Sequence, residues 1–182
     1  MIIARQKKKE NIAEYVLYMW QVEDLIRASH FDIEIIQSTI IDKFDQPEEV
    51  KGQMRTWYSD IINMMQEEHV TGKGHIQIVK NVVNDIDELH LALLRSPKHV
   101  DYNVLFFNLL PCLVEFRQKS CVSAEVNDVE LALNMMYDIL LLRLQKREIS
   151  EGTLAAVSQV SRFLAVLSDL YRKDENDELE LE

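Results

Sequence analysis

Residues 131–144 read LALNMMYDILLLRL, and only Asn134, Asp138 and Arg143 in this stretch are strongly polar. Residues 104–114 read VLFFNLLPCLV and contain a single strongly polar residue. A helix that is apolar on almost all sides must be surrounded by protein. We therefore predict that the two stretches form the central helix pair of an all-α bundle, or line a subunit interface. The side chains expected in the core are Phe106, Phe107, Leu110, Leu113, Leu133, Met136, Leu140 and Leu144.

The composition of the whole chain favours the same fold class. Of its 182 residues, 47% are hydrophobic and 28% are charged, which excludes wholesale disorder. Four glycines and three prolines are too few for the many turns of a β-sandwich or barrel. We predict a single helical domain over residues 1–173. Residues 174–182 contain six acidic residues and no basic one, so we expect a disordered tail there.

Apolar periodicity and helix-ending residues predict six long helices and one short one. The sequence Thr-Gly-Lys-Gly at 71–74 is the clearest break, and Ser96-Pro97 ends another helix because a residue before proline avoids helical geometry. Pro111 lies inside a predicted helix, where we expect a kink or a split. The long helices are expected at 8–29, 47–70, 75–95, 98–119, 128–148 and 151–173, and the short one at 32–44.

Charge and cysteine usage limit the partners and the compartment. Twenty basic and 31 acidic residues give a net charge of −11, which disfavours nucleic acid as a partner. The only basic run is residues 5–9, so a nucleic-acid role ranks last. Two cysteines are too few for a disulfide framework, and no apolar stretch reaches the ~20 residues of a membrane span. The start of the chain lacks the charge order of a secretory signal, so we expect a cytoplasmic protein without a membrane partner.

No motif in the sequence identifies a catalytic residue or a cofactor. Helical bundles can hold two metal ions with paired Glu-x-x-His motifs. The nearest approach is Asp87 with His90, three positions later, and it has no second copy. His90 therefore fits a partly buried or surface histidine better than a metal ligand. The glycine-containing break lacks the P-loop spacing, and Cys112 lies in an apolar run that suppresses thiol reactivity.

The most distinctive stretch is residues 15–27, YVLYMWQVEDLIR, where large aromatic side chains alternate with charged ones. In a helix, Trp20, Asp24 and Arg27 share one face, and both Glu23 and Asp24 can pair with Arg27. A similar set of aromatic residues and methionines occurs over 54–65. Core packing explains both sets, and a ligand or partner face is the alternative. The residues of that candidate face are Trp20, Glu23, Asp24, Arg27, Trp57 and Tyr58.

The same N-terminal stretch carries a family resemblance. KKKENIAEY at 7–15, followed by YMWQVEDLIR at 18–27, resembles an uncharacterised bacterial family, the domain of unknown function 4924. The resemblance implies a bacterial, cytoplasmic protein with one domain. It implies no activity, cofactor or catalytic residue.

Two classes of function remain. The first is a non-enzymatic interaction or assembly protein that forms a homodimer or binds a protein partner, as the apolar helices and the aromatic faces suggest. The alternative is a helical bundle that binds a small ligand or a metal and is possibly an enzyme.

Overall fold

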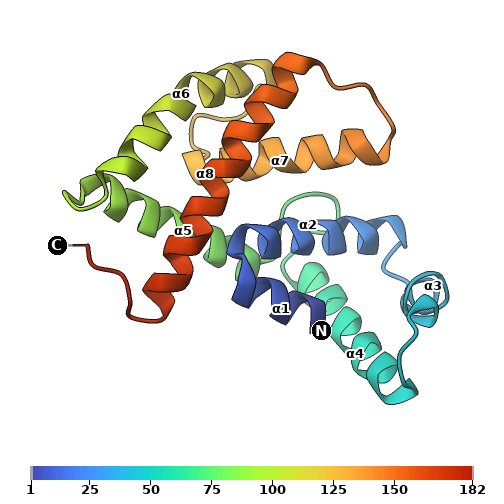
Figure 1. The fold of residues 1–182 in the computed structure, drawn as a ribbon. Coiled ribbons are helices and arrows are strands. Elements are labelled where there is room, and N and C mark those ends of the chain that lie inside the picture. The colour runs from blue at the N-terminus through green and yellow to red at the C-terminus, as the bar shows by residue number, and fades with distance from the viewer. Residues whose placement is uncertain (1, 182) are drawn as a thin grey trace.

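The computed structural model describes residues 2–181, and within that range it contains helices and no strand (Figure 1). The prediction of an all-α bundle is confirmed. The α-helices are α1 (Ile2–Glu10), α2 (Ile12–Ala28), α3 (Ile33–Thr39), α4 (Glu48–Glu67), α5 (Gln77–Arg95), α6 (Val100–Ser120), α7 (Asp128–Leu144) and α8 (Glu151–Glu175), with a 3-10 turn η1 (Ile41–Lys43) after α3.

Helix α8 crosses the middle of the bundle (Figure 1). It packs against α2, α5, α6 and α7, and its Val160, Phe163 and Leu167 are buried. The backbone N–H of Ala13, in the first turn of α2, donates a 3.3 Å hydrogen bond to the Ser168 hydroxyl of α8. The last helix therefore holds the beginning of α2 in place.

The N-terminal segment forms two helices where a single one over 8–29 was predicted. Asn11 has extended backbone angles, and its side chain accepts a hydrogen bond from the Glu14 N–H. Asparagine at an N-cap satisfies a backbone donor that the first turn of a helix leaves free. The chain therefore ends α1 and starts α2 at this residue.

Helix α7 is largely buried, as predicted, but α6 is not. Phe106 and Leu113 of α6 lie in the core, whereas Phe107 is 61% exposed, so its assignment to the core is wrong. The apolar residues along a helix show which of its faces are apolar. They do not show whether other helices of the fold cover each of those faces. Helix α6 also runs past Pro111 without a break, so a split at this residue is wrong, and a kink there stays a prediction.

The end of α7 also differs from the prediction. The helix stops at Leu144 rather than at residue 148, and Leu144 is 69% exposed, not in the core. Lys146 takes a left-handed conformation, and the Arg147 N–H donates to the Leu142 carbonyl, which is a common way to close a helix. Met136 and Leu140 are half-buried.

The acidic end of the chain makes defined contacts. Helix α8 extends to Glu175, and Glu180 forms an ion pair with Lys98 at 3.0 Å. The Leu181 carbonyl accepts a hydrogen bond from the Ser96 hydroxyl, in the connection between α5 and α6. A frayed tail would lack such contacts. Whether residues 174–182 are disordered in solution stays a prediction. The last residue of the predicted tail, residue 182, lies outside the described residues.

In residues 2–181, none of the helices combines the length and the apolar character that crossing a membrane requires.

Candidate functional site

A completely buried carboxylate lies in the middle of α2. Glu23 is 0% exposed and accepts a 2.9 Å hydrogen bond from the Ile76 N–H, at the start of α5. Its second oxygen lies 2.5 Å from Nδ1 of His75. An ionised carboxylate can only accept hydrogen bonds, so we assign the proton to Nδ1 of His75. Burying a carboxylate without donors is costly, and these two donors satisfy Glu23.

The His75 ring stacks on Trp20, which in turn contacts Tyr137. The ring centroids of His75 and Trp20 are 4.5 Å apart, with an angle of 16° between the planes. Tyr137 of α7 packs edge-on against the indole, with ring centroids 5.5 Å apart. Trp20 is buried, and its Nε1–H has no acceptor among residues 2–181. The imidazole is therefore held both at one edge and on one face.

Arg27 ties the connection between α4 and α5 to α2. Its guanidinium donates to the Val70 carbonyl at 2.9 Å and also to the Gly74 carbonyl, at the two ends of the glycine-containing turn. It further pairs with Asp24 at 2.8 Å. Because His75 follows this turn directly, Arg27 helps to place the histidine against Glu23.

Asp24 in turn links α2 to α7. The Tyr137 hydroxyl donates a 2.6 Å hydrogen bond to the Asp24 carboxylate. Burial raises the pKa of Tyr137, and the hydrogen bond to Asp24 raises it further. The phenol therefore stays a neutral donor at physiological pH.

A small pocket of about 150 Å³ opens beside the His75 ring. We call it the His75 pocket. It lies between α2, the first half of α5 and the start of α7. Its lining side chains are Trp20, His75, Gln77, Lys80, Val83, Asn84 and Glu130.

The structure brings together four of the six residues of the predicted face. Trp20, Glu23, Asp24 and Arg27 all belong to the cluster around His75. Trp57 and Tyr58 pack against each other on α4, with ring centroids 5.0 Å apart, and neither lines the His75 pocket. The sequence interpretation missed His75 and Tyr137 as members of this cluster. Glu23 is a carboxylate on an otherwise apolar helix face, and this feature could have indicated that a donor such as His75 lies beside it.

The predicted metal pair does not form a ligand set. His90 is 1% exposed, its Nδ1 lies 2.5 Å from the Tyr102 hydroxyl, and burial lowers its pKa to about 4. Asp87 has acidic neighbours, and burial together with Asp128 and Glu130 raises its pKa. In the described part of the chain, no three His, Cys, Asp or Glu side chains gather as metal ligands would.

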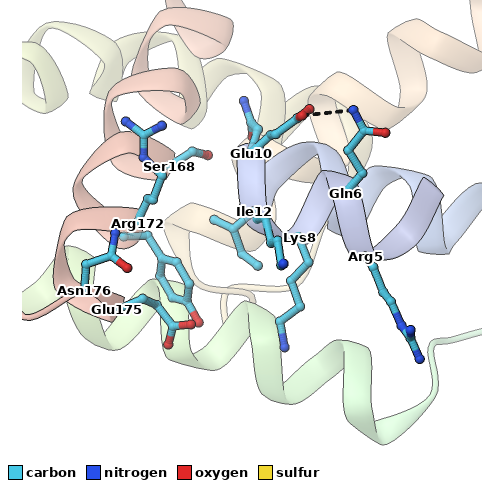
Figure 2. A pocket seen from close by; sticks show the side chains of 12 residues that line it. Arg5, Gln6, Lys8, Glu10, Ile12, Ser168, Arg172, Glu175 and Asn176 are labelled. Atoms are coloured by element: carbon cyan, nitrogen blue, oxygen red, sulfur yellow. Dashed lines mark hydrogen bonds between the residues drawn. The ribbon is translucent and has the colours of Figure 1, made fainter. Parts of the chain in front are cut away.

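A cleft of about 750 Å³ lies between α1 and the end of α8 (Figure 2). Arg5, Lys8 and Lys9 of α1 line it together with Arg172 of α8. Figure 2 shows that the Arg5 side chain extends away from α8, and Arg172 pairs with Asp169 on its own helix. The cationic groups therefore do not converge on one point, and the cleft lacks the arrangement of an anion site.

A comparison with protein families places the chain. A family model described as a domain of unknown function (DUF4924) matches residues 1–178. The chain belongs to the DUF4924 family. The match confirms the resemblance seen at residues 7–27 and extends it over nearly the whole chain. Comparisons with curated proteins and with solved structures return no match.

This DUF4924 chain also exposes a row of apolar side chains on α6. The row consists of Val100, Val104, Phe107, Pro111 and Val114, all of which are exposed. Their spacing of four, three, four and three residues places them on one side of the helix. We call this row the α6 stripe.

Proposed function

We propose that this protein is a non-enzymatic interaction protein that forms a homodimer through the α6 stripe. The exposure of Phe107, a large aromatic residue at the centre of the stripe, carries the proposal. Scattered surface apolar residues are ordinary, whereas a continuous apolar row is typical of an interaction surface. Helix α6 packs against α5, α7 and α8 through its buried face, which contains Phe106 and Leu113, and the stripe lies outside that face.

The spacing of the stripe supports a second copy of the chain as that partner. Val100 precedes Phe107 by seven residues and Val114 follows it by seven, while Val104 and Pro111 lie three before and four after. Two α6 helices crossing antiparallel at Phe107 would therefore bring Val100 of each copy near Val114 of the other. A two-fold interface requires such a self-complementary patch. At 1.5 Å per residue the row extends for about 21 Å.

Sedimentation velocity at micromolar concentrations tests the dimer. We expect the wild-type protein to sediment as a dimer and Phe107→Glu to sediment as a folded monomer, because a charge at the centre of an apolar interface is left unpaired. Ile78→Glu is the matched control, since Ile78 of α5 is 51% exposed and lies outside the stripe. A wild-type monomer at high micromolar concentration would overturn the proposal.

We further propose that the protein is bacterial, that it is located in the cytoplasm and that it does not bind nucleic acid. Both cysteines, Cys112 and Cys121, are free thiols, which suits a reducing compartment. The net charge of −11 opposes binding to phosphate backbones. Fractionation of the host cells checks the compartment, and a titration of labelled DNA and RNA at low salt checks the partner. Recovery outside the cytoplasmic fraction, or saturable binding, would contradict these parts.

A further inference from the structure

We propose that the His75 pocket binds a small zwitterionic amino acid, with its carboxylate toward Lys80 and its ammonium group toward Glu130 and the free ring nitrogen of His75. This inference is independent of the dimer, since the pocket lies between α2, α5 and α7, whereas the α6 stripe is on another helix.

The first step is the state of the histidine. Nδ1 of His75 is engaged by the fully buried Glu23, so the edge of the ring that remains partly exposed carries Nε2. Within residues 2–181, Nε2 has no hydrogen-bond partner. A carboxylate behind an imidazole fixes its tautomer and its orientation. With the proton on Nδ1, the Nε2 of His75 is a hydrogen-bond acceptor, so it presents the pocket with an oriented partner for an N–H donor.

The second step is the charge of the lining. Lys80 and Glu130 both line the pocket, and neither forms an ion pair within the described part of the chain. The Asn84 amide also lines the pocket and has no hydrogen-bond partner in that part of the chain. One free cation, one free anion and one free amide match a ligand that carries both charges. Asp87 and Asp128 near Glu130 add negative charge on the side assigned to the ammonium group.

The third step is size. A cavity of about 150 Å³ holds a molecule of roughly the size of benzene, with six heavy atoms. Alanine and serine have this size, whereas nucleotides and acyl chains exceed it. The apolar surfaces of Trp20 and Val83, both buried, suit a short aliphatic side chain.

The fourth step is rigidity. Arg27 holds both ends of the turn before His75, and Glu23 holds the start of α5 through the Ile76 N–H. The two sides of the pocket are therefore positioned before a ligand arrives, which lowers the entropic cost of binding.

Trp20 fluorescence in the full-length Trp57→Phe variant tests the proposal, because Trp20 is then the only tryptophan in the chain. Glycine, alanine and serine are titrated up to about 10 mM, with ethylamine and acetate as ligands that carry one charge each. We expect a saturable change in emission with at least one amino acid, and none with ethylamine or acetate. Absence of a saturable change with all three amino acids overturns the proposal. Equal responses to acetate or ethylamine overturn the zwitterion assignment.

Charge-removing variants locate the binding site. Glu130→Gln and Lys80→Met should each weaken binding about tenfold or more, since each removes a charge-assisted contact. Glu49→Gln and Lys9→Met, at exposed positions that do not line the pocket, are the matched controls and should bind as the parent does. Unchanged affinity in both Glu130→Gln and Lys80→Met would place the ligand elsewhere and overturn the proposal. Since none of these residues is in the α6 stripe, loss of binding with an intact dimer separates this proposal from the proposed function.

Discussion

His75 lies just before α5 and His90 lies in its second half, and the surroundings of the two histidines differ. His90 is enclosed by the rings of Tyr102, Phe106 and Phe163, with a phenol as its hydrogen-bond partner. His75 is partly exposed, faces a buried carboxylate and borders a pocket. An apolar enclosure keeps a histidine neutral and makes it part of the core. A carboxylate behind a partly exposed ring instead leaves a nitrogen available for a ligand.

The largest expected effect comes from removing an aromatic neighbour of His90. Phe163→Ala should lower the free energy of unfolding by about 3–5 kcal/mol, because Phe163 is 0% exposed and the truncation leaves a cavity. Urea denaturation measures this loss. Ile78→Ala, at an exposed position of α5, should stay within about 0.5 kcal/mol of the wild type. A similar small loss for Phe163→Ala would show that the His90 cluster is not a packed core.

The pH dependence of stability should distinguish the two histidines. Burial lowers the folded-state pKa of His90 to about 4, against 6.5 for an unperturbed histidine. The unfolded chain therefore binds more protons between these values, so stability should fall by up to about 3 kcal/mol as the pH drops from about 6.5 to 4.

His90→Phe removes this proton uptake, so its loss of stability over the same pH window should be smaller than that of the wild type. Denaturation at several pH values gives the difference between the two proteins. Parallel pH profiles would mean that His90 is not the group responsible.

A smaller effect is expected at the His75 end. Glu23→Ala leaves the Ile76 N–H and the Nδ1–H of His75 without their buried acceptor, which should cost about 2 kcal/mol. Glu14→Ala in the same helix removes only an exposed pair with Lys7 and should cost less than about 1 kcal/mol. Equal losses in the two variants would show that the buried carboxylate has no special role in holding the connection before α5.

Local signals predicted many of the helix ends. Asn127 caps α7 and Ser150 caps α8, each by accepting a hydrogen bond from a backbone N–H three residues later. Such caps depend only on neighbouring residues, so a single sequence contains the information. The apolar row of α5, from Val79 to Leu93, is likewise buried as its spacing indicates.

The tertiary partners could not be predicted in the same way. Glu23 and His75 are 52 positions apart, and Asp24 and Tyr137 are 113 apart. No periodicity relates such distant residues, because the packing of the helices decides which side chains meet. The exposure of Phe107 has the same origin, since the apolar run in α6 looks alike whether neighbouring helices cover all of its faces or only some.

The hydrogen bond from Ala13 to Ser168 has a consequence for synthesis on the ribosome. The helix that carries Trp20 and Glu23 emerges well before α8, because Ser168 follows Ala13 by 155 residues. The part of α2 that faces α8 therefore stays uncovered until α8 has been made. Nascent chains halted before α8 should bind chaperones through this part of α2, and release should follow once residue 168 has left the exit tunnel.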